Sequence, residues 1–120
     1  MQITECLHVA ILVSQLERSE DFYGNILHLP KINRQLNFPG AWYEVGKFQL
    51  HLIVATNHTI EAHNTEKWGR NPHLAFAVTD LNAVKQNLLN HHYPIQNSAS
   101  GRAAIFTQDP DGNVIEFTQV

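Results

Sequence analysis

Two stretches of the chain, residues 7–14 and 72–79, alternate large apolar residues with small or polar ones. Alternation at every second position is typical of a β-strand that buries one face. In both stretches a histidine, His8 or His73, falls on the face opposite the bulky residues. Each stretch is followed by an apolar stripe at helical spacing and then by shorter strand-like segments. The hydrophobic pattern therefore predicts the same order of elements twice: a strand, a helix and three further strands.

The turn and cap signals place the boundaries of these elements. A capping box of Ser14 and Glu17 is expected to start the first helix, because such a pair satisfies free amide groups at a helix amino terminus. The sequence Asp109-Pro110-Asp111-Gly112 predicts a turn before the last strand, because proline fixes φ and glycine accepts a positive φ. We expect strands near residues 5–13, 32–36, 41–45, 48–55, 73–78, 95–97, 103–107 and 114–118, and the second helix over about 80–91.

The two halves are also similar residue by residue, which indicates an internal duplication. A shift of 65 positions places His8 on His73 and His51 on Glu116, with apolar neighbours in register around both pairs. At 120 residues the chain fits a single domain of the α+β class. We divide this domain into a first βαβββ module over about 1–55, a polar linker over 56–71, and a second module over about 72–120.

Four residues at symmetric positions are candidates for a metal site: His8, His51, His73 and Glu116. Strand alternation places all four off the bulky apolar faces, and a pseudo-twofold axis would bring the two opposite faces together. Imidazole nitrogens and a carboxylate are ligands that Zn, Ni, Fe or Mn accepts. A buried carboxylate is costly without a cation, so Glu116 in particular requires a partner. A hydrogen-bonded structural role is the alternative for any one of the histidines taken alone.

Composition and charge exclude several other classes of function. The net charge of −3 gives no basic footprint for nucleic acid, and no apolar run approaches the roughly 20 residues of a membrane span. The amino terminus lacks a signal-peptide pattern and the lone Cys6 cannot close an intramolecular disulfide, so we expect a cytoplasmic protein. The remaining histidines are interpreted as surface or helix-capping residues: His28, His58, His63, His91 and His92.

Four segments together carry a resemblance to a known family: Leu7-His8-Val9-Ala10, residues 19–23 (Ser-Glu-Asp-Phe-Tyr), residues 73–76 (His-Leu-Ala-Phe) and residues 109–117. In these segments the chain resembles the vicinal-oxygen-chelate superfamily, which includes glyoxalase I, fosfomycin-resistance proteins, bleomycin-resistance proteins and extradiol dioxygenases. The resemblance implies two βαβββ modules that form incomplete barrels around a divalent metal, and a homodimer. Whether each site is built within one chain or across two stays open.

The resemblance also implies a set of ligands and a reaction. It carries His8, His73 and Glu116 over as metal ligands, and it places His51 where glyoxalase I usually has a carboxylate or amide. The implied activity is that of a metal-dependent lyase or isomerase, which acts on a small substrate with adjacent oxygens through a metal-stabilised enediolate. Glu116, or a water bound to the metal, would be the catalytic proton shuttle. The substrate and the native metal stay open.

Departures from the family pattern leave two alternative functions. Leu12 and Ala55 stand where glutathione-dependent glyoxalases resemble one another in carrying Arg and Asn, which argues against glutathione. A metal-independent module of the bleomycin-resistance type, which binds a small molecule or antibiotic by aromatic stacking, is the first alternative. An extradiol-type dioxygenase is the second, although Phe106 replaces its acid–base Tyr and His51 would fill a coordination position that oxygen needs.

Overall fold

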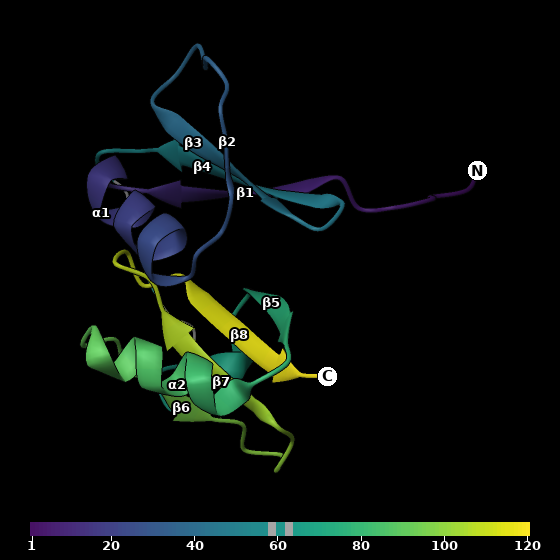
Figure 1. Cartoon of the computed structure of the whole chain (residues 1–120), viewed down its shortest axis with the longest axis vertical. Coiled ribbons are helices and arrows are strands. Elements are labelled where there is room, and N and C mark those ends of the chain that lie inside the picture. The colour runs from purple at the N-terminus through teal and green to yellow at the C-terminus, as the bar shows by residue number, and fades with distance from the viewer. Residues whose placement is uncertain (58–59, 62–63) are drawn as a thin grey trace. The chain divides into compact units, whose positions relative to one another are not determined.

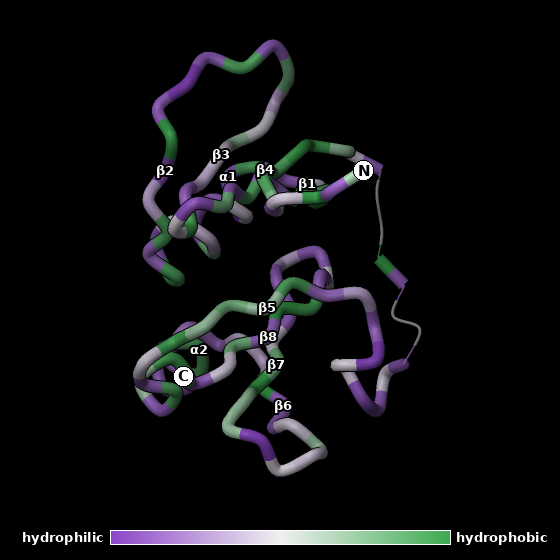
Figure 2. Tube along the Cα trace, turned by 90° about the vertical axis from the view of Figure 1, so that its right-hand side faces the viewer, coloured by the Kyte–Doolittle hydropathy of each residue, from purple (hydrophilic) through white to green (hydrophobic). Residues whose placement is uncertain are grey.

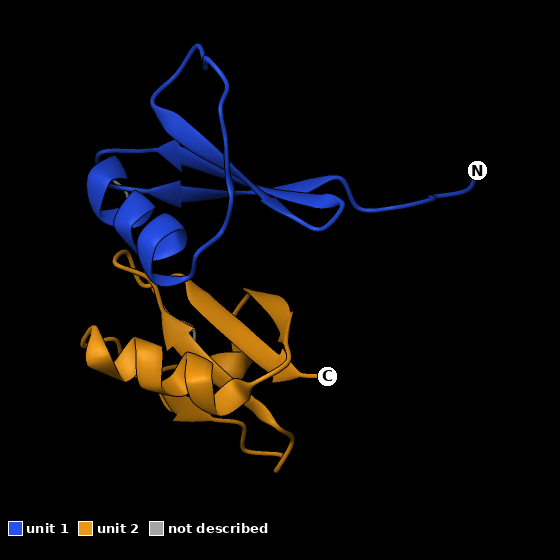
Figure 3. Cartoon of the chain, in the orientation of Figure 1, with its two compact units in different colours: residues 1–58 blue, residues 59–120 orange. Residues whose placement is uncertain are grey.

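The computed structural model describes residues 1–57, 60–61 and 64–120, and the chain divides into two compact units, residues 1–58 and 59–120 (Figures 1 and 3). The predicted surface histidines His58 and His63 lie outside the described residues. The elements of the first unit are β1 (His8–Val13), α1 (Leu16–Glu20), the π-helix η1 (Asp21–Ile26), β2 (Lys31–Ile32), β3 (Gly40–Val45) and β4 (Phe48–Val54). Those of the second unit are the 3-10 helix η2 (Trp68–Arg70), β5 (His73–Val78), α2 (Leu81–Asn90), β6 (Gln96–Asn97), β7 (Ala104–Gln108) and β8 (Val114–Gln119).

Each unit contains one four-stranded sheet with the same topology. The strand orders are β1-β4-β3-β2 and β5-β8-β7-β6. β1 is parallel to its neighbour β4, and β5 is parallel to its neighbour β8. The other neighbouring strands are antiparallel. The helix and the two strands that lie between β1 and β4, or between β5 and β8, form the long connection that a parallel pair requires. The predicted α+β class with two βαβββ modules is confirmed, and both sheets are open rather than closed barrels.

The hydrogen-bonding register repeats the duplication seen in the sequence. Ala10 pairs with His51 across β1 and β4, and Ala75 pairs with Glu116 across β5 and β8, so both pairs are related by the shift of 65 positions. The third strand of the second unit is offset by 64 rather than 65 positions, because His51 pairs with Trp42 whereas Glu116 pairs with Phe106. An aromatic residue of the third strand is therefore the direct neighbour of the polar residue of the fourth strand in both units.

The alternation of buried and exposed side chains follows the sequence pattern. In β1 and β5, exposure rises and falls at every second residue, with His8, Ala10 and Leu12 on the open face of β1. The opposite faces contribute to the apolar core, and Figure 2 shows apolar residues recurring along the strands of both units. The largest fully buried apolar side chains are Tyr23, Tyr43, Phe22, Leu50, Leu52, Leu88, Ile105, Ile115 and Val13.

The first helix differs from the expected one at its start and along its length. The N-cap residue is Gln15 rather than the expected Ser14, and the Gln15 side chain makes no capping hydrogen bond. Ser14 Oγ accepts a hydrogen bond from Arg18 at 3.4 Å. The helix widens into η1, where the amide of Leu27 donates to the carbonyl of Phe22, five residues earlier, at 2.9 Å. Phe22, Tyr23 and Ile26 are buried in this segment, at the spacing that an α-helical stripe also has.

The turn predicted before the last strand is confirmed. Both carboxylate oxygens of Asp109 are used: Oδ1 accepts from the amides of Asp111 and Asn113 at 2.9 and 2.8 Å, and Oδ2 accepts from the Asn113 side chain at 2.8 Å. Gly112 adopts a φ of +90°, which favours glycine. This internally bonded turn fixes where β8 begins and thereby the position of Glu116 in it.

Two further sequence expectations concern the surface. His28, His91 and His92 are exposed, as expected for residues at helix ends. In the described part of the chain no helix combines the length and apolar character needed to cross a membrane. The stretch expected to be a solvated linker contains the short helix η2, which packs against β8. The boundary between the two units falls inside this stretch, and η2 belongs to the second unit.

Replacing His92 with glycine is expected to stabilise the chain by about 0.5 to 1 kcal/mol. His92 has a φ of 65° just after α2, and the amides of His92 and Tyr93 bond the carbonyls of Leu89 and Leu88. These two bonds form a Schellman motif, whose left-handed position favours glycine. Urea unfolding measures the change. His91→Gly is the control, because His91 has a φ of −100° and should lose stability; equal effects of both variants would contradict the explanation.

Candidate functional site

The first pair of predicted ligands lies on the open face of the first unit. His8 on β1 and His51 on β4 stack with their ring centroids 4.2 Å apart and their planes 14° apart. The opposite face of His51 lies on Trp42, with centroids 3.7 Å apart and planes 2° apart. The guanidinium of Arg34 covers the Trp42 ring at 4.3 Å. Four planar groups thus form one stack, which holds the His51 ring in a single orientation.

The surroundings of His51 keep its ring neutral and determine which ring nitrogen carries the proton. Burial, the neighbouring His8 and the charge of Arg34 lower the pKa of His51 below its usual value. The side-chain oxygen of Gln49 lies 2.9 Å from Nε2 and can only accept a hydrogen bond, so Nε2 carries the proton and Nδ1 keeps its lone pair. A neutral imidazole with a free lone pair is the form that binds a metal ion.

The second pair lies in the second unit, where the side chains of His73 on β5 and Glu116 on β8 meet. The Nε2 atom of His73 lies 3.0 Å from Oε1 of Glu116. On the other side of the ring, Nδ1 lies 2.7 Å from the backbone carbonyl of Asn71, so Nδ1 carries a proton. On a neutral ring Nε2 then presents a lone pair to a carboxylate oxygen. Two electron-rich atoms at this distance require a cation between them, either a proton or a metal ion.

Glu116 is buried but remains a carboxylate because three groups compensate its charge. Only 7% of the residue is exposed. Its Oε2 atom accepts a short hydrogen bond from the hydroxyl of Thr118 and lies 3.5 Å from the guanidinium of Arg102. Burial acts to raise the pKa of Glu116, but the hydrogen bonds from Thr118 and His73 and the charge of Arg102 outweigh it, so the pKa lies below its usual value. The group is therefore ionised at neutral pH.

The four predicted residues thus form two pairs, one in each unit. Each pair consists of two residues diagonal to one another on parallel neighbouring strands, as the register requires. Within the described residues, no three His, Cys, Asp or Glu side chains gather in a cluster that could hold a metal. The chemistry of the donors nevertheless fits a divalent ion, since neutral imidazoles and an ionised carboxylate are what borderline metals accept.

The sequence patterns did not indicate three residues that support the second pair. Thr118 carried a usable signal, because it lies two positions after Glu116 on the same face of one strand. Asn71 is buried in the segment expected to be a solvated linker, and its side chain bonds the carbonyls of Asn64 and Trp68 at 2.8 and 3.1 Å. Arg102 reaches Glu116 from the loop before β7, and no sequence pattern indicated that contact.

Comparison with known proteins identifies a family and several relatives. The model of the Glyoxalase/Bleomycin resistance protein/Dioxygenase superfamily matches residues 6–117. The chain is 26% identical to Glyoxylase I 4 of Arabidopsis thaliana over 98% of its own length and 71% of that protein. It is 28% identical to a lactoylglutathione lyase of Neisseria meningitidis over 94% of its length and 88% of that protein.

Solved structures show the same fold at lower sequence identity. A glyoxalase/dioxygenase from Nostoc punctiforme superposes with a TM-score of 0.78 at 20% identity and covers 96% of this chain and 90% of that one. A genomically encoded fosfomycin resistance protein from Listeria monocytogenes superposes with a TM-score of 0.76 at 14% identity, over 99% of this chain and 95% of that one. Proteins whose names denote different functions therefore share this fold, so the fold alone does not identify the reaction.

Proposed function

Because the chain belongs to the Glyoxalase/Bleomycin resistance protein/Dioxygenase superfamily, we propose that it is a metal-dependent lyase or isomerase that acts on a small substrate with adjacent oxygens. His8, His51, His73 and Glu116 would hold one divalent ion, with the two pairs supplied by the two units of one chain or by two chains of a homodimer. The stack on His51 and the hydrogen bond on His73 would orient the ligands, as outer partners do in metal sites.

The arrangement of His73 between Asn71 and Glu116 carries this proposal. A carbonyl fixes the proton on Nδ1, at 2.7 Å, and a carboxylate faces Nε2, at 3.0 Å. In metal sites, the ring nitrogen of a histidine that does not bind the metal commonly donates to a carbonyl or a carboxylate, as Nδ1 does here. Nε2 and Oε1 of Glu116 would then be neighbouring ligands of one ion.

The residues of the chain would contribute binding and proton transfer. A bound divalent ion would supply Lewis-acid stabilisation of negative charge on the substrate oxygens. Glu116, ionised at neutral pH, would accept a proton from the carbon next to those oxygens and return it to the neighbouring carbon. Thr118 and Arg102 hold Oε2, so Oε1 is the oxygen that faces the ligand side of the site.

The test is an isomerase assay with 2-oxoaldehydes and their adducts with several thiols, run before and after removal of metal. We expect turnover to be lost on dialysis against EDTA and restored by one of Zn, Ni, Mn or Fe(II). The replacement of the family's Arg by Leu12 predicts no preference for the glutathione adduct.

Two results would contradict the proposal and point to the alternatives. Ligand binding that is unchanged by EDTA, with no turnover on any substrate, would favour a binding module. Oxygen uptake with catechols in the presence of Fe(II) would favour a dioxygenase.

A further inference from the structure

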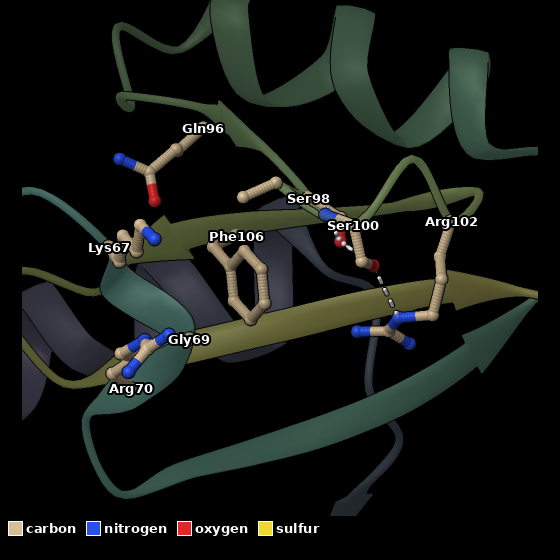
Figure 4. A pocket seen from close by; sticks show the side chains of 9 residues that line it. Lys67, Gly69, Arg70, Gln96, Ser98, Ser100, Arg102 and Phe106 are labelled. Atoms are coloured by element: carbon tan, nitrogen blue, oxygen red, sulfur yellow. Dashed lines mark hydrogen bonds between the residues drawn. The ribbon is translucent and has the colours of Figure 1, made fainter.

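A basic cavity of about 350 Å³ opens in the second unit between η2 and the segment from β6 to β7 (Figure 4). Three cationic residues line it, Lys67, Arg70 and Arg102, and no acidic residue does. The whole chain has only 8 Lys and Arg residues and a net charge of −3. Three of these 8 cations therefore gather in one cavity of a chain whose net charge is negative, and the positive charge of the cavity favours the binding of anions.

The walls of the cavity are held in place by hydrogen bonds. The side chain of Gln96 accepts from the amide of Trp68 at 2.9 Å and donates to the carbonyl of Glu66 at 2.8 Å, so it fastens η2 to β6. On the opposite wall, Ser98 and Ser100 share a hydrogen bond of 2.9 Å between their hydroxyls, and Ser100 Oγ accepts from Arg102 Nε at 3.2 Å. Cations and hydroxyl groups thus face the cavity from walls that are already ordered, which reduces the entropy cost of binding.

An aromatic ring forms the floor of the cavity and separates the cations (Figure 4). Phe106 lies so close to Gly69 that a Cβ atom added there would be 2.6 Å from the ring. A larger residue at position 69 would therefore force either this ring or η2 to shift. Phe106 also makes an edge contact with the ring of His73, with centroids 5.5 Å apart. Since Arg102 also reaches Glu116 at 3.5 Å, the cavity directly adjoins the His73–Glu116 pair.

We propose that this cavity binds the anionic end of the substrate, a carboxylate or phosphoryl group, with the apolar part of the same molecule on Phe106. Lys67 and Arg70 pair with the anion, and the serine hydroxyls complete its hydrogen bonds. The substrate of the neighbouring site is then an anionic molecule, such as a small acid or phosphate ester with adjacent oxygens. That assignment to the substrate rests on the proposed function; the binding of anions by the cavity does not.

The test measures binding rather than turnover. Benzoate, phenyl phosphate and the neutral benzyl alcohol are titrated by calorimetry into the full chain, as purified and after metal has been removed with EDTA and the EDTA dialysed away. We expect at least one anion to bind at least about tenfold more tightly than the alcohol in both conditions, and binding to weaken in high salt. The stronger anion distinguishes a carboxylate from a phosphoryl group. Equal binding of the alcohol, or no binding of either anion, overturns the proposal.

Charge-removing variants locate the site. Lys67→Gln combined with Arg70→Gln changes two exposed side chains and should weaken the preferred anion by about tenfold or more, since two ion pairs are lost. Lys85→Gln on α2, outside the cavity, is the matched control and should bind as the wild type does. A double variant that keeps its circular dichroism spectrum and full anion affinity would also overturn the proposal. Anion binding that survives EDTA while turnover is absent would leave the cavity in place and reject only the proposed reaction.

Discussion

Replacing Glu116 with glutamine is expected to lower the affinity for divalent metal by more than about 100-fold, since loss of even an outer partner of a ligand costs about 10 to 100-fold. The amide keeps the size of the side chain but removes its negative charge. It also leaves the Arg102 guanidinium, 3.5 Å from Oε2, without a carboxylate partner. Isomerase turnover should fall with the metal content. Metal analysis of the purified protein and a competition titration with a chelating dye measure the effect.

A matched variant separates this effect from a general loss of charge. Glu61→Gln removes an exposed carboxylate from the same unit and should leave the metal affinity unchanged. If Glu116→Gln bound metal as tightly as the wild type and kept its fold, Glu116 would not be a ligand. His8→Ala and His51→Ala, measured in the same way, test whether the first pair belongs to the same ion.

Replacing Leu52 with alanine is expected to destabilise the chain by about 2 to 5 kcal/mol. Leu52 is 0% exposed and lies on the core face of β4, directly after His51. The truncation removes buried apolar surface and leaves a cavity among side chains that are packed closely. Since a domain of this size is stable by about 5 to 15 kcal/mol in total, the variant should unfold at a much lower urea concentration.

Leu12 provides the control for this experiment. It lies on the neighbouring strand β1 but on the open face, and it is 39% exposed. Leu12→Ala should therefore cost well under about 1 kcal/mol, as surface substitutions usually do. Similar losses for Leu12→Ala and Leu52→Ala would show that the two faces of the sheet are not distinguished by burial. Circular dichroism during urea unfolding measures both variants.

Local sequence patterns predicted much of the fold. The period of two in β1 and β5 predicted which face is buried, because successive side chains of a strand point to opposite sides. The shift of 65 positions predicted that His51 and Glu116 occupy equivalent places, and the pairings Ala10–His51 and Ala75–Glu116 confirm this. The predicted turn at Asp109 also formed, because its chemistry lies within five neighbouring residues.

The first helix differs from its local sequence signal. Ser14 and Glu17 match a capping pattern, yet the helix begins one residue later and widens into η1.

The candidate site shows the same division between sequence and structure. The sequence by itself determined the four polar positions, their shared faces and the residue types that suit a metal, since all of these follow from strand periodicity. Only the tertiary structure decided that Trp42 stacks on His51, that Asn71 fixes the His73 proton, and that Arg102 reaches Glu116. It also gathered Lys67, Arg70 and Arg102 around one cavity. The physical reason is that such contacts join residues whose separation along the chain carries no periodic signal, so they exist only once the strands have paired and the loops have packed.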